Sequence, residues 1–265
     1  MVVLSRIVSS HTNPTVKAVR ALHMRKAREE SGQFLAEGLK IVTEAVDLGY
    51  APKILMYGRE AADHPLLRKA ISVTYEAGGE VIEVNREILE KIARRDNPQA
   101  VLAVFEQTYE PLVMLAPHTA PVWVALHKVR DPGNLGTIIR TADAAGCGGV
   151  ILIGDCCDPY SVEAVRATMG SIFAVPIIKA TEEEFIAWRV LWPGSVVGTL
   201  LTARTDHRTA KYQTPTLILM GNEQAGLPPE LAGLCDINVK IPMRGRADSL
   251  NLAVATGIMI YAVGE

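Results

Sequence analysis

The spacing of apolar and polar residues divides the chain into two stretches, each of alternating strands and helices. From residue 12 to 30, apolar residues recur on one side of a predicted helix and Lys or Arg on the other. A strand running into a helix follows at 34–49. Further strands and helices are predicted in alternation, at 52–58, 64–79, 80–85, 86–94 and 99–106. We therefore expect residues 1–107 to form a small α/β domain.

Residues 108–120 show no clear period and, together with Pro121, contain three prolines, which predicts a linker. From residue 121 onward the expected strands are nearly continuous runs of apolar residues, among them PVWVALHKV, VILIG, IFAVPII, SVVGTLL and TPTLILM. Helical patterns separate them. Such strands are typical of a parallel sheet covered on both faces. Residues 121–265 are thus predicted to form a second, larger α/β domain.

Polar loops follow these strands where a ligand site is expected. An open parallel sheet binds ligands at the carboxyl ends of its strands. The loops there read DPGN, GDCCDPYS, TLLTARTDH, GNEQAG and PMRGRAD. No G-x-G-x-x-G follows the first strand, and Leu-Pro follows GNEQAG where a phosphate loop has Lys-Ser/Thr. The sequence therefore does not support a dinucleotide site or a nucleoside triphosphate site.

The C-terminal stretch 241–263 combines the end of a strand, a polar loop with two arginines and a strongly apolar helix, which we predict to be buried. Ser249 and Asn251 lie where this helix begins, and Asn134 holds a capping position in DPGN. Ser and Asn commonly cap free backbone N–H groups at such positions. A second reading is a ligand site, because N–H groups, a hydroxyl, an amide and positive charge meet at one point. Both readings stay open on these residues alone.

Charge and cysteine content narrow the function classes. The net charge is −2, but residues 1–28 carry six Lys or Arg and no Asp or Glu. That run is either a phosphate-binding surface or a solvated helix face balanced by Glu29, Glu30 and Glu37. The four cysteines lack zinc-site spacing and suggest no disulfide framework. No membrane span or signal peptide is indicated, so we expect a reduced, cytoplasmic location.

Three ordered motifs carry a family resemblance. They are N-x5-R at Asn134 and Arg140, G-N-E at 221–223, and S-L-N at 249–251. Over residues 120–263 the chain resembles the SpoU/TrmH branch of the SPOUT methyltransferases, which transfer methyl from S-adenosylmethionine to a ribose 2′-hydroxyl of RNA. The resemblance implies a deep trefoil knot in the parallel-sheet domain and a homodimer formed through it. Residues 1–107 are similar to the L30e-like substrate-binding domain of ribosomal-RNA members.

The resemblance also implies roles for individual residues. Arg140 matches the proposed catalytic arginine, and Asn134 would order its loop. The remaining positions are expected to shape the site (Glu223, Ser249, Asn251), to hold the cofactor (Thr199, Gly221, Ile241, Met243, Leu250) and to contact RNA (Arg20, Arg25, Arg28, Arg166). The alternative for Arg140 is a surface salt bridge with Asp143. No metal is expected, because a sulfonium methyl donor is already activated.

The leading function is therefore 2′-O-methylation of ribosomal RNA, of the 23S type. One alternative is a tRNA 2′-O-methyltransferase, which the separate N-terminal domain disfavours. Another is a non-catalytic RNA-binding or ribosome-assembly protein on the same fold, which the intact motifs disfavour.

Overall fold

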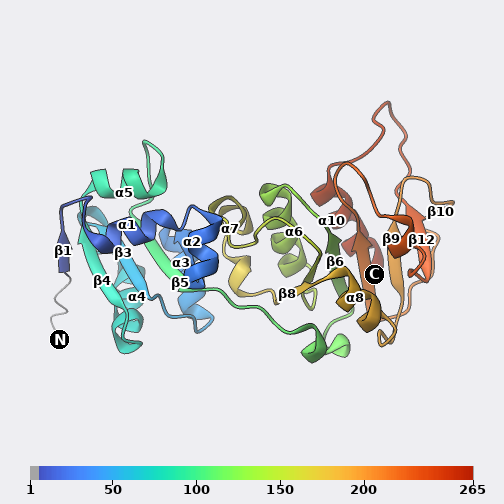
Figure 1. Cartoon of the computed structure of the whole chain (residues 1–265), viewed down its shortest axis with the longest axis horizontal. Helices are drawn as coiled ribbons and strands as arrows, with labels where there is room; N and C mark the ends of the chain where they lie inside the picture. Colours follow the sequence, from blue (N-terminus) through green and yellow to red (C-terminus); the bar gives the residue numbers. More distant parts are fainter. Residues whose placement is uncertain (1–5, 265) are drawn as a thin grey trace. The chain divides into compact units, whose positions relative to one another are not determined.

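The computed structural model describes residues 6–264, and contacts within the chain group them into two compact units (Figure 1). The first unit contains the residues up to Gln107 together with Tyr160–Phe173; the second contains Thr108–Pro159 and the residues from Ala174 onward. Within residues 6–264, no helix combines the length and the apolar character that crossing a membrane requires.

The first unit is a five-stranded sheet with helices on both faces, in the strand order β1-β4-β3-β5-β2. Strands β1, β4 and β3 run parallel, and β5 pairs antiparallel with β3 and β2. Helices α1 and α5 pack together, and so do α3 and α4. The elements are β1 (Arg6–Val8), α1 (Pro14–Ala21), α2 (Arg25–Ser31), β2 (Gln33–Glu37), α3 (Leu39–Asp47), β3 (Ile54–Gly58), a 3-10 helix (Arg59–Ala61), α4 (Pro65–Glu76), β4 (Glu80–Val84), α5 (Arg86–Ala93) and β5 (Val101–Glu106). The α/β prediction for this unit is confirmed.

The single helix predicted at 12–30 is wrong, because the structure breaks it after Ala21 into α1 and α2. Two tertiary hydrogen bonds hold the break. The Arg28 guanidinium donates to the carbonyl of Leu22 at 2.8 Å, and Nε2 of His23 lies 2.7 Å from the carbonyl oxygen of Ile92. In an unbroken helix the carbonyl of Leu22 would accept from the backbone N–H four residues on, and would not be left to the Arg28 side chain.

The segment Tyr160–Phe173 contains α7 (Val162–Thr168). It lies in the second half of the sequence but packs as part of the first unit. Tyr160 packs on Phe34 with ring centroids 4.6 Å apart, and Phe173 packs on Phe105 at 4.8 Å. Ser171–Phe173 forms a 3-10 turn that places Phe173 in this aromatic cluster. The strand predicted over IFAVPII therefore begins only at Ile177.

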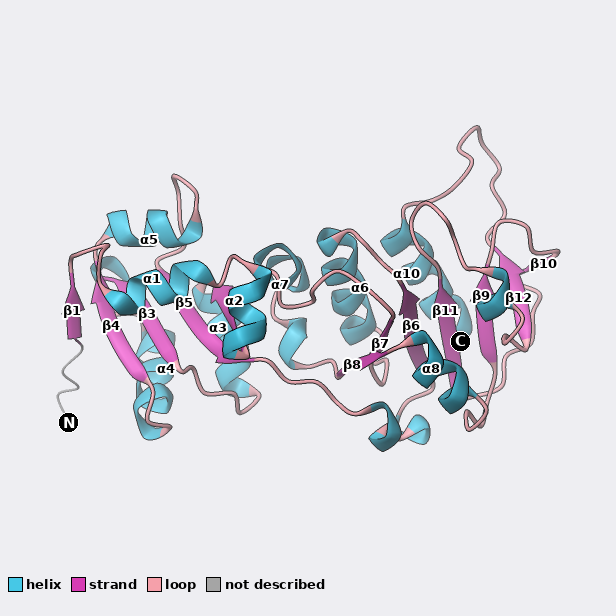
Figure 2. Cartoon of the chain, in the orientation of Figure 1, coloured by secondary structure: helices cyan, strands magenta, loops and turns pink. Residues whose placement is uncertain are grey.

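The second unit is a seven-stranded sheet in the order β10-β12-β9-β11-β6-β7-β8, and every pair is parallel (Figure 2). Its strands are β6 (Val122–His127), β7 (Val150–Ile153), β8 (Ile177–Ala180), β9 (Val196–Thr199), β10 (Thr205–Asp206), β11 (Thr216–Met220) and β12 (Ile237–Lys240). Its helices are α6 (Pro132–Ala144), α8 (Glu182–Arg189), α9 (Pro229–Ala232) and α10 (Leu252–Val263). The predicted parallel sheet is confirmed.

Both faces of this sheet are buried. One face packs Trp123 and Leu217 against Trp188 and Leu231, from α8 and α9. Helix α10 packs against α6, β11 and β6. The predicted linker is ordered on this unit: it forms 3-10 turns at Leu112–Met114 and Pro117–Thr119, and Leu112 is buried in the core.

The prediction that the C-terminal helix is buried holds for one side of it only. Its buried residues are Ala253, Thr256, Met259 and Ile260. Val254 and Tyr261 are 52% and 55% exposed. An apolar face of α10 is therefore open to solvent on a single chain.

Candidate functional site

The three sequence motifs meet at the carboxyl edge of the second unit's sheet. The side-chain amide of Asn251 donates to Oδ1 of Asn134 at 2.9 Å. The amide of Asn134 donates in turn to Oε1 of Glu223 at 3.4 Å. These residues follow β12, β6 and β11, so one chain of hydrogen bonds connects three loops that lie far apart in the sequence.

Glu223 anchors the loop between β6 and α6. Its carboxylate accepts hydrogen bonds from the backbone N–H groups of Arg130 and Asp131, at 3.1 and 3.0 Å. Partial burial raises the pKa of Glu223, but the hydrogen bonds from Asp131, Arg130 and Asn134 outweigh it and hold the pKa below its usual value. Neighbouring Asn222 donates to the carbonyl of Lys128 at 2.7 Å. The carboxylate is therefore ionised and engaged in ordering the loop.

Helix capping at the site differs in part from the prediction. Asp131, and not Asn134, caps α6: its carboxylate accepts from the backbone N–H of Asn134 at 2.6 Å. Asn251 does cap α10, accepting from the N–H groups of Ala253 and Val254. The side chain of Asn251 thus caps a helix and joins the hydrogen-bond chain at the same time. Ser249 lies before the cap and lines a pocket.

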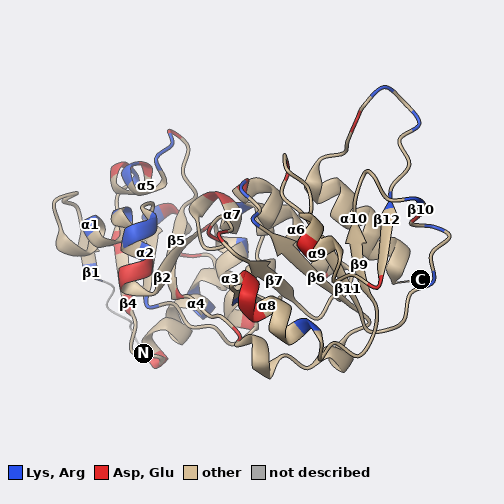
Figure 3. Cartoon of the chain, turned by 45° about the vertical axis from the view of Figure 1, so that its right-hand side comes forward, with Lys and Arg blue, Asp and Glu red and all other residues tan. Residues whose placement is uncertain are grey.

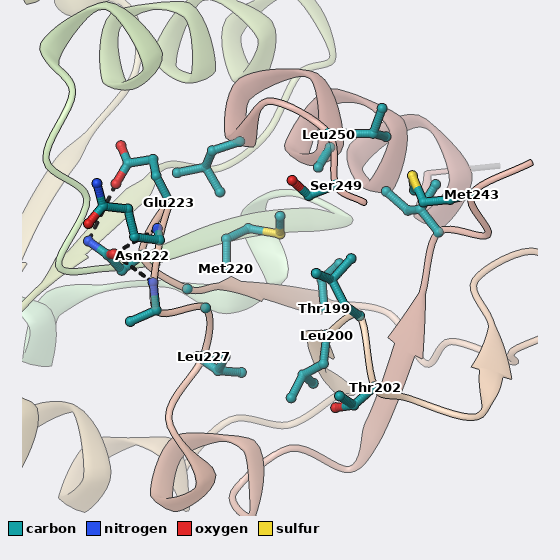
Figure 4. A pocket seen from close by; sticks show the side chains of 18 residues that line it. Thr199, Leu200, Thr202, Met220, Asn222, Glu223, Leu227, Met243, Ser249 and Leu250 are labelled. Carbon is teal, nitrogen blue, oxygen red and sulfur yellow. Dashed lines mark hydrogen bonds between the residues drawn. The ribbon is translucent and has the colours of Figure 1, made fainter. Parts of the chain in front are cut away.

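That pocket has a volume of about 340 Å³ and is formed by four stretches of chain, residues 199–202, 220–227, 241–243 and 249–255 (Figure 4). Its wall is largely apolar, with Met220, Leu227, Met243 and Leu250 among the side chains. The structure brings all five predicted cofactor residues to this pocket: Thr199, Gly221, Ile241, Met243 and Leu250. The size and the apolar wall are typical of a small-molecule site.

Two residues of the pocket, Gly221 and Thr199, differ from the rest in their packing and hydrogen bonding. Gly221 is needed for chain packing: a Cβ atom at this position would lie 2.1 Å from the backbone of Gly226 and Leu227. The loop can fold back on itself only because Gly221 has no side chain. The hydroxyl of Thr199 is buried and has no hydrogen-bond partner among residues 6–264. A ligand with a donor or acceptor at that point would satisfy it.

Arg140 is exposed on α6 and is not part of the pocket wall. It comes six positions after Asn134, which places it about 9 Å further along the helix axis and roughly 120° around it. It makes no ion pair with Asp143 or with any other residue of the described range. The surface salt bridge considered for Arg140 is absent, and its guanidinium is free to meet a ligand.

The four predicted RNA contacts have different environments in the first unit. Arg28 is 3% exposed and donates to Leu22, so its guanidinium cannot reach a phosphate, and that prediction is wrong. Arg166 pairs at 2.6 Å with the buried carboxylate of Glu37, which Arg95 also contacts at 2.8 Å. Arg25 pairs with Glu29, and Arg20 is exposed. Arg20 and Arg25 therefore remain on the surface.

Replacing Arg166 by alanine is expected to lower the stability of the first unit by about 2 kcal/mol, because a buried carboxylate then loses one of two partners. Thermal unfolding of Arg166→Ala measures this. Arg68→Ala is the matched control, since it breaks an exposed pair with Asp63 and should cost about 0–1 kcal/mol. Unchanged stability with reduced RNA affinity would instead make Arg166 an RNA-binding residue.

The sequence patterns did not assign Leu200–Thr202 and Leu227 to the pocket. A signal was present for the first group: TLLT follows directly on a buried strand, at the edge where ligands bind. Leu227 had no such signal, because it reaches the pocket through the fold-back of the loop after Gly221.

Known protein families match both parts of the chain. The model of the SpoU rRNA methylase family matches residues 121–261. The chain belongs to the SpoU rRNA methylase family. A second model, for an MRM3-like substrate-binding domain, matches residues 13–103. This SpoU chain therefore pairs a methylase domain with a domain described as binding substrate.

Relatives cover nearly the whole chain. The SpoU chain is 30% identical to the Bacillus subtilis 23S rRNA guanosine 2′-O-methyltransferase RlmP, over 96% of this chain and 97% of the relative. It is 32% identical to a Streptomyces viridochromogenes 23S rRNA uridine 2′-O-methyltransferase, over 91% and 86%. The crystal structure of an AdoMet-bound rRNA methyltransferase from Sinorhizobium meliloti aligns with a TM-score of 0.91, at 51% identity and coverage of 98% and 97%.

Glu223→Gln is expected to destabilise the methylase unit by about 1–2 kcal/mol at neutral pH, because charge-assisted hydrogen bonds to two backbone N–H groups become neutral ones. The lowered pKa in the folded state means that the carboxylate stabilises the fold above about pH 4.3, the ordinary Glu value, and stops doing so as the pH falls through the folded pKa. Unfolding of wild type and variant from pH 3 to 7 should show the difference growing with pH. A difference independent of pH would contradict this role; Glu230→Gln, exposed on α9, is the control.

Proposed function

We propose that this protein transfers methyl from S-adenosylmethionine to a ribose 2′-hydroxyl of 23S ribosomal RNA. The observation that carries the proposal is the meeting of the three family motifs beside one pocket: Glu223 and Ser249 line it, and hydrogen bonds join Asn134 to Glu223 and to Asn251. Two relatives support the RNA class. They modify different nucleotides, guanosine 2553 in one and uridine 2479 in the other, so the nucleotide itself is not carried over.

The pocket residues fit S-adenosylmethionine. Ile241, Met243 and Leu250 offer an apolar surface to an adenine ring, and the unpartnered hydroxyl of Thr199 offers a hydrogen bond to a polar group. The cofactor would supply a methyl group already activated on a sulfonium, which is why no metal is required. Backbone groups around Gly221 would complete the hydrogen bonds.

The chemistry left to the protein concerns the 2′-hydroxyl, a poor nucleophile. As the methyl group leaves the sulfonium and S-adenosylhomocysteine is released, this hydroxyl must lose its proton, to a neighbouring RNA phosphate or to water. Glu223 does not suit the role of base, because its carboxylate already accepts backbone hydrogen bonds. Arg140 does not suit the role of base either, because an arginine guanidinium stays protonated in proteins. Arg140 instead stabilises negative charge on the reacting oxygen and grips a neighbouring phosphate by bidentate hydrogen bonds. The exposed, unpaired state of Arg140 supports this role.

Two measurements separate this function from its alternatives. Calorimetry should detect S-adenosylmethionine binding to the wild type, which a non-catalytic RNA-binding protein would not show. Transfer of labelled methyl should then favour 23S rRNA over tRNA, as the match of residues 13–103 to a substrate-binding domain supports. Binding without transfer to either RNA would overturn the proposal, and transfer to tRNA alone would favour the first alternative.

We also propose a homodimer formed through the methylase unit. The apolar face of α10 supports it, since Val254 and Tyr261 are more than half exposed on one chain. Sedimentation at micromolar concentration is expected to show a dimer, and Tyr261→Lys should shift it to the monomer. Lys179→Ala, on the edge strand β8, should not. A wild type that sediments as a monomer would defeat this proposal.

The same family membership supports two further assignments. One is a trefoil knot in the methylase unit, in which the chain after β11 would pass through a loop formed earlier. The other is a cytoplasmic location, where ribosomal RNA is found.

A further inference from the structure

Two loops at the mouth of the cofactor pocket are rich in positive charge that the predicted functions do not use. The first follows β9 and spans residues 200–214; the second follows β12 and spans 241–251. Together they contain five Lys or Arg and two Asp, in a chain whose net charge is −2. Figure 3 shows the basic residues on the loop between β12 and α10 and on the segments around β10.

Both loops contribute residues to the wall of the same pocket. Leu200, Leu201 and Thr202 line it from the first loop, and Ile241, Met243 and Ser249 from the second. The first loop also lies beside the strand that leads into the second: β10 pairs parallel with β12, Thr205 opposite Val239 and Asp206 opposite Lys240. Arg204 directly precedes this pairing. Arg244 directly follows Met243, which lines the pocket, and Arg246 comes two positions after Arg244.

Three of these guanidinium groups are free. Arg204, Arg244 and Arg246 are exposed, and the structure gives them no ion pair or hydrogen bond within residues 6–264. Arg208 differs, because Asp206 accepts two hydrogen bonds from its guanidinium. That pairing also neutralises Asp206, so Asp248 is the acidic residue left on the two loops. Free arginines fixed on the loops of a ligand site, and not along a solvated helix, are suited to binding phosphate.

We propose that Arg204, Arg244 and Arg246 form a phosphate-binding rim that holds the RNA backbone beside the ribose to be methylated. The inference rests on the proposed function and adds a second RNA surface, on the methylase unit itself. Phosphate contacts position a nucleic acid without reading its sequence. The rim would therefore set how the target ribose meets the pocket, and leave the choice of RNA to the first unit.

The test compares two triple variants that each remove three positive charges. The rim variant is Arg204→Ala/Arg244→Ala/Arg246→Ala. The control is Arg59→Ala/Arg68→Ala/Lys69→Ala, on the 3-10 helix and α4 of the first unit. RNA affinity is measured by fluorescence anisotropy on a labelled mixed-sequence RNA hairpin, between about 50 and 200 mM salt, where phosphate binding shows most clearly. S-adenosylmethionine affinity is measured by calorimetry on the same samples, which also reports that the pocket is folded.

The rim variant should bind the hairpin at least ~10-fold more weakly than the control. Its slope of log affinity against log salt should be shallower by about 2 to 3, because each of the three phosphates that the rim no longer neutralises changes the slope by about 0.7 to 0.9. Its cofactor affinity should equal that of the wild type.

Equal RNA affinity and slope in the two variants would overturn the proposal. A fall in cofactor affinity in the rim variant would also overturn it, and would assign the arginines to the cofactor carboxylate. The proposed function is tested separately, by methyl transfer with the wild type. A wild type that transfers no methyl group would overturn that function, whatever the rim variant shows.

Discussion

Arg140→Ala is expected to reduce single-turnover methyl transfer by roughly 100-fold or more, the scale seen when one donor to a developing oxyanion is removed. Arg140→Lys should not restore the rate, because an ammonium lacks the planar fork that holds phosphate and hydroxyl together. S-adenosylmethionine affinity should stay unchanged, since Arg140 is outside the pocket wall. Transfer rate, cofactor affinity and thermal midpoint should be measured on one sample.

The matched control is Asp143→Ala on the same helix. Because Arg140 and Asp143 form no ion pair, this change should leave both the rate and the midpoint close to wild type. A normal rate in Arg140→Ala, with a small fall in the midpoint, would instead make Arg140 a structural residue.

Gly221→Ala is expected to weaken S-adenosylmethionine binding by about 100-fold or more, because it displaces the loop that shapes the pocket. The added Cβ would lie 2.1 Å from the backbone of Gly226 and Leu227, and backbone cannot turn away as a flexible side chain can. Relieving such a clash costs about 3 kcal/mol, which equals that fall in affinity if the loop must move to do so. Calorimetry of the variant checks the expectation.

Gly245→Ala provides the control, because a Cβ there meets nothing within 4 Å although Gly245 lies on another loop of the same site. Cofactor affinity should be preserved in this variant. Equal affinity in both glycine variants would show that the fold-back of the loop at Gly221 does not shape the pocket.

The elements best predicted from the sequence are those whose burial leaves a local pattern. Strands such as β6 and β11 are covered on both faces, so they read as continuous apolar runs. The break between α1 and α2 has no such pattern, because its hydrogen bonds reach from Arg28 back to Leu22 and from His23 to Ile92. The strand β10 is two residues long, too short for any period to show.

The site divides in the same way. The pocket loops were predictable because each follows a strand at the binding edge of a parallel sheet. The environment of Arg28 and Arg166 was not predictable from the sequence. An arginine looks the same in sequence whether its guanidinium faces solvent or, as with Arg166, pairs with a buried carboxylate from a distant strand. For the same reason, the sequence did not predict that Tyr160–Phe173 packs with the first unit, because contacts between residues far apart in the sequence leave no local pattern.

The most direct test of the account is a map of ribose 2′-O-methylation across all RNA of a strain that lacks this protein. The account predicts that one 23S rRNA ribose loses its methyl group, that the wild-type gene restores it and that the Arg140→Ala gene does not. A 23S rRNA methylation pattern identical to that of the parent strain, or a methyl group missing from tRNA alone, would contradict it.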